Sequence, residues 1–222
     1  MNQPSQQQSL DALAPLVTDH KKELMKQVLS QRTRHITLLL EEIFQPHNAS
    51  AALRSCDCFG IQDIHVVEAK NSYSPSKEVD MGSSKWLTLH RYKTDIDDAI
   101  STLKKKGYTV VATTPHANGF TPETLPLDKP IALAFGTELE GLTDRAIELA
   151  DSYLTIPMYG FTESFNISVS VAIILNRLVE RMRATDDIKW HLTDDEKEEL
   201  TLQWYRKIIK RSDEIEKFIV SR

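Results

Sequence analysis

Four polar residues stand out in three short segments of the sequence. Asn48 and Arg54 lie in HNASAALR, Glu138 lies in FGTELEGL, and Asn166 lies in IPMYGFTESFNISVSVA. Arg54 is a single positive charge among small and apolar residues, and a guanidinium group can only donate hydrogen bonds. Each residue also has a structural interpretation. Arg54 suits a surface side chain, Glu138 suits an exposed carboxylate near a helix N-terminus, and the two asparagines suit helix caps.

The same segments are rich in small and apolar residues. They contain Gly136, Gly141 and Gly160, together with Ile156, Met158 and Phe165. Such a lining suits a flat, partly apolar ligand that is held by main-chain hydrogen bonds and packing. The sequence contains no G-x-G-x-x-G fingerprint, no P-loop pattern and no G-x-S-x-G elbow, which disfavours the ordinary dinucleotide, nucleotide and serine-hydrolase sites.

Strand and helix patterns alternate from residue 36 onward. Short apolar runs rich in β-branched residues predict buried parallel strands at 36–43, 64–69, 108–114, 131–136 and 152–157. Helices are predicted at 48–59, 94–106 and 143–150, followed by two long helices at 164–183 and 194–219. This alternation predicts an α/β fold with a mostly parallel sheet flanked by helices. Such folds bind ligands outside the carboxyl ends of their strands, which is where the three segments fall.

The 222 residues suit one domain with terminal extensions. We expect a flexible tail at 1–18, a basic helix at 19–34, the α/β domain at 35–184 and a helical extension at 185–222. No apolar run approaches the roughly 20 residues that cross a bilayer, and no signal peptide is recognisable, so a cytoplasmic protein is expected. Cys56 and Cys58 lack a second cysteine pair, which predicts reduced, at least partly buried thiols and no metal site.

Basic residues concentrate near both ends of the chain. Residues 19–34 carry five Lys or Arg against two acids, and residues 201–211 carry four basic groups and no acid. The net charge is −5, which argues against a wholly basic nucleic-acid coat. RNA could still dock locally, because phosphate contacts act at a surface patch rather than through net charge. Charge alone favours solvated helix faces over an RNA-binding surface.

Taken together, the three segments resemble the three motifs of the SPOUT RNA methyltransferases, in the SpoU/TrmH branch. HNASAALR, LAFGTELEGL and IPMYGFTESFNISVSVA appear in the order and spacing of that family, and the similarity extends over about residues 32–183. Three short stretches are most similar to the tRNA guanosine methyltransferases of the branch. They are P-H-N at 46–48, R-S-C-D-C-F-G at 54–60 and G-S-S-K-W at 82–86. Only about 35 residues precede the first strand, so a large N-terminal RNA-binding domain is not expected.

The resemblance implies a fold, a cofactor and an assembly. It implies a deep C-terminal trefoil knot, which ordinary folding rules would never suggest, and a homodimer. It also implies that S-adenosylmethionine binds in the knot loops. The residues carried over to the cofactor site are Thr113, Gly136, Ile156, Met158, Ser164 and Phe165. Phe165 departs from the family, where an aliphatic residue is usual, but a main-chain contact would survive the change.

The resemblance also implies a reaction. A methyl group passes to a ribose 2′-hydroxyl of RNA, with a D-loop guanosine of tRNA as the expected target. Ribosomal RNA, another tRNA position and a non-catalytic RNA-binding protein are the alternatives. The implied catalytic set is Arg54, Asn48, Glu138 and Asn166. Arg54 either loses a proton and acts as the base, or stays charged and stabilises the developing alkoxide.

RNA is expected to contact the basic segments at the two ends of the chain. Trp204 and Tyr205 could stack on bases, although packing of a terminal helix suits them better. The basic residues expected to bind RNA are Lys21, Lys22, Lys26, Arg32, Arg34, Arg206, Lys207, Lys210 and Arg211.

Overall fold

The computed structural model describes residues 4–43, 45–69 and 82–220. These residues form two compact units, which we describe separately. Residues 33–190 form one unit, called here the sheet unit. Residues up to Arg32 and those from His191 onward together form the other, called here the terminal-helix unit. The expected domain 35–184 falls within the sheet unit.

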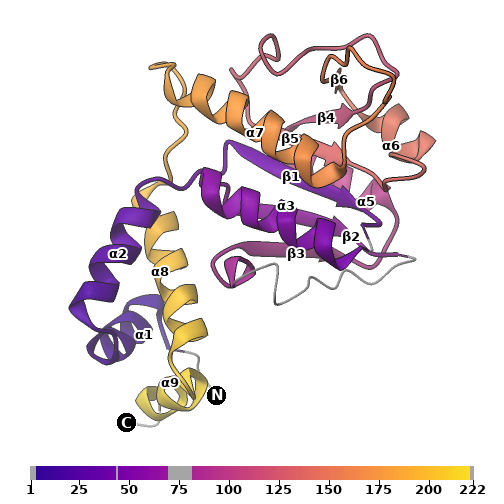
Figure 1. Cartoon of the computed structure of the whole chain (residues 1–222). Helices are drawn as coiled ribbons and strands as arrows, with labels where there is room; N and C mark the ends of the chain where they lie inside the picture. The colour runs from indigo at the N-terminus through magenta and orange to yellow at the C-terminus, as the bar shows by residue number, and fades with distance from the viewer. Residues whose placement is uncertain (1–3, 44, 70–81, 221–222) are drawn as a thin grey trace. The chain divides into compact units, whose positions relative to one another are not determined.

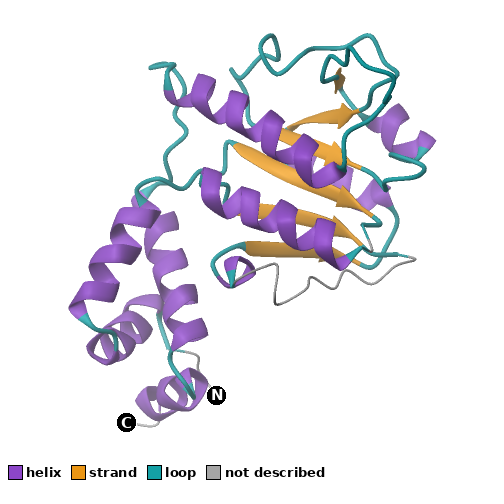
Figure 2. Ribbon diagram, viewed as in Figure 1, coloured by secondary structure: helices purple, strands orange, loops and turns teal. Residues whose placement is uncertain are grey.

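The sheet unit contains a six-stranded parallel sheet (Figure 2). Its spatial order is β3-β2-β1-β5-β4-β6, which confirms the predicted α/β fold. Every residue of β1, β2 and β5 is buried, as in a sheet that is covered on both faces. The strands are β1 Ile36–Glu41, β2 Asp63–Val67, β3 Thr88–Tyr92, β4 Thr109–Thr113, β5 Ile131–Phe135 and β6 Ser152–Leu154.

Strand β3 was missed by the sequence patterns. Its sequence, TLHRY, has no apolar run, and its residues are only half-buried or exposed. The strand lies at one edge of the sheet, where only β2 pairs with it. An edge strand needs less apolar surface than a central one, so its hydrophobic signal is weak.

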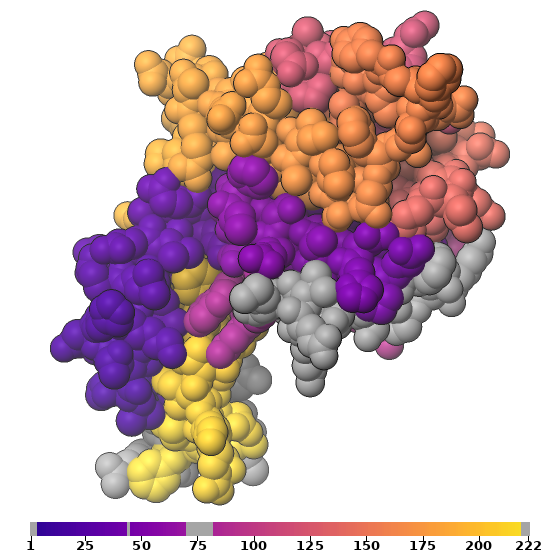
Figure 3. Space-filling view, viewed as in Figure 1, coloured from indigo at the N-terminus to yellow at the C-terminus, as the bar shows by residue number. Residues whose placement is uncertain are grey.

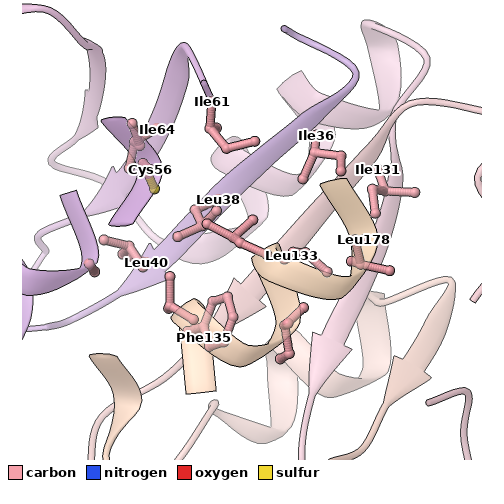
Figure 4. Packing of buried hydrophobic residues seen from close by; sticks show 14 of the residues in the cluster. Ile36, Leu38, Leu40, Cys56, Ile61, Ile64, Ile131, Leu133, Phe135 and Leu178 are labelled. Atoms are coloured by element: carbon pink, nitrogen blue, oxygen red, sulfur yellow. The ribbon is translucent and has the colours of Figure 1, made fainter. Parts of the chain in front are cut away.

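Helices cover both faces of the sheet (Figure 1). One face carries α3 Pro46–Phe59 and α7 Ile167–Arg183, which pack side by side (Figure 3). In Figure 4, Leu178 of α7 lies beside Ile131 and Leu133 of β5 within this layer of the core. The opposite face carries α5 Ile96–Lys105 and α6 Asp144–Leu149. A short 3₁₀ helix, η2 Ser83–Lys85, precedes β3.

Helix α3 begins earlier than the sequence pattern suggested. Its N-cap is Gln45 and its first residue is Pro46, a residue that suits this position because its missing N–H has no helical partner there. Asn48 is therefore the third residue of the helix and not its cap, which corrects that structural interpretation. The predicted end of this helix at residue 59 is confirmed, and Gly60 after it adopts the left-handed conformation at φ 79°.

The expected flexible tail is wrong for residues 6–16. This stretch forms α1 Gln6–Leu13 and the 3₁₀ helix η1 Ala14–Leu16. A capping box between Ser5 and Gln8 starts α1, and Leu13 is fully buried. Polar composition hid this helix, because it buries only a narrow stripe against the other terminal helices.

The remaining terminal helices are shorter than expected. The basic helix is α2 Asp19–Leu29, and it ends before residue 34. The helix expected at 194–219 is divided into α8 Asp194–Ile208 and α9 Ser212–Val220. Arg211 has a positive φ of 61°, which a continuous right-handed helix does not allow.

Two other expectations concern thiols and membranes. Both cysteines are free thiols, but only Cys56 is buried, whereas Cys58 is exposed. Among the described residues, no helix is long and apolar enough to cross a bilayer. No group of three or more His, Cys, Asp or Glu side chains that could hold a metal ion occurs in that part of the chain.

Candidate functional site

A cavity of about 330 Å³ lies at the carboxyl ends of β4, β5 and β6, within the size range of small-molecule sites. Its walls are the loops that follow these strands and the start of α7. All six residues expected to contact the cofactor line this cavity, and Glu138 lines it too. The six are Thr113, Gly136, Ile156, Met158, Ser164 and Phe165.

One wall of the cavity is a tight turn between β5 and α6. Thr137 and Gly141 exchange two main-chain hydrogen bonds of 2.9 and 3.0 Å. Gly141 has φ 72°, a conformation that glycine adopts without strain. A Cβ atom on Gly136 would lie 1.9 Å from the Gly141 carbonyl oxygen. The turn therefore closes only because residue 136 has no side chain.

A chain of hydrogen bonds joins the three sequence segments. The Asn166 amide donates to the Asn48 carbonyl oxygen at 3.1 Å. The Asn48 amide donates in turn to a Glu138 carboxyl oxygen at 2.5 Å and to Gln45 at 2.9 Å. Asn166 and Asn48 are 118 positions apart in the sequence, and Asn48 and Glu138 are 90 apart, yet all three meet beside the cavity. The structure brings together three of the four residues expected to be catalytic.

Asn166 has both a capping role and this tertiary role. Its side-chain oxygen accepts hydrogen bonds from the Ser168 N–H at 2.9 Å and from the Ser168 hydroxyl at 2.6 Å, and it is the N-cap of α7. Its amide nitrogen donates to Asn48. Asn166 can therefore cap α7 and bind Asn48 at the same time, because an amide has separate donor and acceptor atoms.

Arg54 stands apart from this network. It lies on α3, six residues beyond Asn48, and its side chain is exposed. Arg54 is not among the residues that line the cavity, and no described residue forms a hydrogen bond or ion pair with its guanidinium group. The charge is thus presented to solvent.

Sequence patterns missed Glu41, a buried carboxyl group at the end of β1. It is only 3 % exposed. One of its oxygens accepts a 2.7 Å hydrogen bond from the Thr143 hydroxyl, and the other accepts a 2.9 Å bond from the Thr143 N–H. The only signal in the sequence was that the apolar run ITLLL ends in an acidic residue.

The structure corrects one residue expected to bind RNA. Arg32 is 1 % exposed, and its guanidinium carbon lies 5.8 Å from the centre of the Trp204 ring. A buried cation stacked on an aromatic ring cannot contact a phosphate. Trp204 and Tyr205 are also buried, which confirms the packing interpretation for both.

The other basic residues differ in how they are paired. Arg34 forms a 2.8 Å ion pair with the buried Asp63, and Arg206 forms one of 2.8 Å with Glu216. Lys22 and Arg211 pair with acids three residues away. The remaining four side chains expected to bind RNA are exposed, and these are Lys21, Lys26, Lys207 and Lys210.

A second polar cluster lies in β2 and β3. Asp63 accepts hydrogen bonds from Arg34 at 2.8 Å and pairs with His90 at 3.0 Å, and the His90 ring stacks on His65 with centroids 4.5 Å apart. Burial alone would raise the pKa of Asp63, but the hydrogen bond with His90 and the charge of Arg34 outweigh it, so this pKa is lowered. Burial first, and then repulsion from His90, lowers the pKa of His65 to about 3.

The fold and the cavity together define an α/β protein with a cavity built from three loops at the carboxyl edge of a parallel sheet. Residues 35–176, well over half of the chain, match the model of the SpoU rRNA methylase family. The chain belongs to this family.

Two relatives and one solved structure illustrate the similarity. The chain is 42 % identical over 212 residues to a tRNA (guanosine(18)-2′-O)-methyltransferase of Borreliella burgdorferi, covering 96 % of each chain. An enzyme of the same name from Thermus thermophilus is 37 % identical over 158 residues, which is 71 % of this chain and 81 % of the relative. The crystal structure of the A. aeolicus TrmH/SpoU tRNA modifying enzyme superposes with a TM-score of 0.77 at 25 % identity, covering 86 % of this chain and 98 % of the other.

Proposed function

We propose that this protein transfers a methyl group from S-adenosylmethionine to the ribose 2′-hydroxyl of a guanosine in the D-loop of tRNA. The observation that carries the proposal is the hydrogen-bonded chain Asn166–Asn48–Glu138 beside a cavity of suitable size. The names of the relatives in B. burgdorferi and T. thermophilus support tRNA and guanosine as the target. A cytoplasmic location follows from this role in RNA modification.

The cavity suits the charge and shape of S-adenosylmethionine. Glu138, Glu140 and Asp144 line it, and no Lys or Arg side chain is among its described lining residues. A cationic sulfonium compound is attracted to such a lining. Leu154, Ile156 and other apolar side chains offer packing for the adenine ring. When bound, the cofactor supplies an electrophilic methyl group.

The residues of the chain then act on the RNA substrate. Asn48, Glu138 and Asn166 hold the loops of the site in a fixed relation, which lowers the entropic cost of reaching the reactive geometry. Guanidinium groups stay protonated in proteins, so we assign Arg54 the role of stabilising negative charge on the ribose oxygen. The 2′-hydroxyl proton leaves to water or another acceptor as the oxygen gains the methyl group.

We also propose the trefoil knot implied by the resemblance. The loop after β4 passes around the end of β6. The Thr114 N–H donates to the Leu154 carbonyl at 3.1 Å, and the Thr155 N–H donates to the Phe120 carbonyl at 2.8 Å. The Thr155 hydroxyl lies within hydrogen-bonding distance of the carbonyls of Thr114 and Ala117, at 2.8 and 3.0 Å. Close contact on both sides of one strand end supports threading of the chain through this loop.

A homodimer is the assembly that we propose. Large apolar side chains on the loops of the site are exposed, with Tyr159 at 96 %, Phe161 at 108 % and Leu139 at 92 %. A second copy would remove these side chains from water, and their burial would favour association. Sedimentation equilibrium should give twice the chain mass, and the double substitution Tyr159→Ser and Phe161→Ser should shift the population towards the monomer.

We propose that RNA docks on the exposed lysines of the terminal-helix unit. The basic residues that already form ion pairs near both ends of the chain would add weaker contacts. Lys21, Lys26, Lys207 and Lys210 carry their charge on exposed side chains. Arg34, Arg206, Lys22 and Arg211 already have acidic partners, so phosphate binding would have to compete with these pairs. Arg32 has no part in this surface, because it is buried.

One assay tests the reaction and its substrate together. The protein is incubated with labelled S-adenosylmethionine and either unmodified tRNA or unmodified ribosomal RNA, and the labelled nucleotide is mapped. Label on the ribose of a D-loop guanosine supports the proposal. Label in ribosomal RNA would move the substrate to the class named in the family description. If RNA binds without any label, the protein has a binding role only and the proposal is wrong.

A further inference from the structure

We infer that Glu41 is a positioning residue that fixes the shape of the cofactor cavity through Thr143, an inference that rests on the proposed function. Glu41 is the last residue of β1, near the centre of the sheet. It does not line the cavity. Its effect on the cofactor would therefore pass through the loop to which it is bonded.

The burial of Glu41 calls for an explanation. A carboxyl group that is 3 % exposed loses its hydration, and this loss is costly unless protein donors replace the water. Thr143 supplies both donors, from its N–H and from its hydroxyl. Both carboxyl oxygens accept, as the ionised form does. The pairing across 102 residues therefore satisfies the buried group and ties two distant segments together.

Thr143 stands at the end of the turn that forms one cavity wall. Leu142 before it and Asp144 after it both line the cavity. Thr143 is also the N-cap of α6, and its hydroxyl oxygen accepts a 3.2 Å hydrogen bond from the Ala146 N–H. The Glu41 carboxyl thus fixes the point at which the turn passes into the helix.

The turn is held at two points, by one residue at the end of β1 and one in the helix that follows it, α3. Glu138 is held by Asn48 of α3, and Thr143 is held by Glu41 of β1. Inside the turn, Thr137 and Gly141 are joined to each other. If the hydrogen bonds from Thr143 to Glu41 are removed, the turn keeps its internal shape and its bond at Glu138, but its far end is held only by the packing of the buried Leu142. Packing is less directional than a hydrogen bond, so the cavity wall at Asp144 can then shift.

The neighbouring carboxyl group provides a matched control. Glu42 is half-buried, and its carboxyl oxygen accepts a 2.8 Å hydrogen bond from the Ala69 N–H, away from the cavity wall. Glu41→Gln and Glu42→Gln make the same chemical change one residue apart. In Glu41→Gln, the amide can bond Thr143 only as a neutral group, so the hydrogen bonds to a charged carboxylate become weaker neutral ones. In Glu42→Gln, the change falls on the hydrogen bond from Ala69, a residue that does not line the cavity.

The test is the dissociation constant of S-adenosylmethionine with the full chain, measured by isothermal titration calorimetry without RNA. We expect Glu41→Gln to weaken binding about tenfold, the effect of replacing hydrogen bonds to a charged group by neutral ones. Glu42→Gln should bind as the wild type does. Thr143→Val, which removes only the hydroxyl, should also weaken binding, whereas Thr143→Ser, which keeps both donors, should preserve it.

A role in stability alone gives a different result. If Glu41→Gln and Thr143→Val lower Tm but bind the cofactor as tightly as the wild type well below Tm, the inference is overturned. Steady-state rates add a second readout, since a shifted cavity wall should raise KM for the cofactor more than it lowers kcat. If the wild-type chain itself fails to bind S-adenosylmethionine, the proposed function and this inference both fall. Equal binding by the wild type and Glu41→Gln removes the inference alone.

Discussion

At the scale of single residues, the hydrogen-bonded groups of the site are separate from the exposed group that we propose to act on the substrate. Asn48, Glu138 and Asn166 are bonded to one another, whereas Arg54 is exposed on α3. A side chain held in such a network can orient a loop, and both amide hydrogens of Asn48 are used for this. The exposed charge is the one that can respond to negative charge forming on a substrate oxygen.

This separation predicts different effects on binding and on rate. Arg54→Ala should lower kcat by a factor of about 10²–10³, the usual effect of removing one group that stabilises a developing oxyanion. The Kd for S-adenosylmethionine should stay unchanged, because Arg54 does not line the cavity. Cys58→Ala changes another exposed residue of the same helix and serves as the control. Normal methylation by Arg54→Ala with intact RNA binding would remove Arg54 from the reaction.

The buried His65 predicts an effect of pH on stability. Its pKa is about 3 in the folded chain, against the ordinary histidine value of 6.5. The unfolded chain therefore binds a proton below pH 6.5 that the folded chain does not bind until pH 3. Stability falls as pH drops through this window, by about 2 kcal/mol between pH 7.5 and pH 5 for this one group.

Urea unfolding of the wild type and His65→Gln at several pH values measures this contribution. The difference between the two curves should shrink from pH 7.5 to pH 5, because only the wild type carries the histidine. Asp63 affects stability in a separate, more acidic pH range. Its lowered pKa means that its stabilising effect is lost only as pH falls below 3.8. Parallel curves for the two proteins between pH 7.5 and pH 5 would contradict the assignment to His65.

At the scale of elements, the turn from Gly136 to Gly141 is the least tolerant part of the site. Gly136→Ala places a Cβ atom against the main chain of Gly141, at 1.9 Å from its oxygen. Main-chain atoms cannot yield as a flexible side chain can, so the turn must open. We expect cofactor binding to fall below detection in calorimetry, with the far-UV circular dichroism of the folded chain retained.

Gly160 offers a control of the same kind. The nearest atom to a Cβ at this position is the Thr162 nitrogen at 4.0 Å, and Gly160 does not line the cavity. Gly160→Ala should bind S-adenosylmethionine as the wild type does. Equal loss in both variants would mean that alanine in these loops acts through something other than the closure of the turn.

The elements with a strong periodic pattern could be predicted, and those defined by tertiary contacts could not. Buried central strands such as Ile36–Glu41 read as continuous apolar runs. The edge strand Thr88–Tyr92 lacks such a run, and α1 is polar on most of its surface. The motif residues were found, because the resemblance carries their positions. Their hydrogen bonds were not, since the Asn48–Glu138 and Glu41–Thr143 contacts join residues about 100 positions apart.

Burial explains why the charge pattern did not predict which basic residues are available to RNA. Arg32 and Arg34 belong to the same basic stretch in the sequence, yet one is stacked on Trp204 and the other is paired with Asp63. A charge count cannot distinguish a solvated cation from a buried one. For the exposed lysines of the terminal-helix unit, RNA binding stays a prediction.

At the scale of the whole molecule, the chemistry and the proposed RNA contacts fall in different units. The cavity and its hydrogen bonds lie within residues 33–190. The two ends of the chain form the terminal-helix unit and carry the exposed lysines. Because the net charge is −5, RNA affinity must come from a local surface, and it should be strongly dependent on salt.

Replacing three of these lysines should therefore weaken binding without changing the chemistry. For Lys21→Gln, Lys26→Gln and Lys210→Gln combined, the slope of log K against log salt should fall by about 2–3, because each phosphate contact accounts for slightly under one unit of slope. The rate at saturating tRNA should stay close to that of the wild type. Filter binding over a range of salt concentrations gives the slope, and single-turnover methylation gives the rate.

A second triple variant separates local docking from a general effect of charge. Lys105, Lys129 and Lys189 are exposed residues of the sheet unit, and their replacement by Gln changes the net charge by the same amount. If RNA docks on the terminal-helix unit, this variant should keep the wild-type slope. Equal losses in both variants would show that RNA responds only to the total charge of the protein. In that case the terminal-helix unit would not be a local docking surface for RNA.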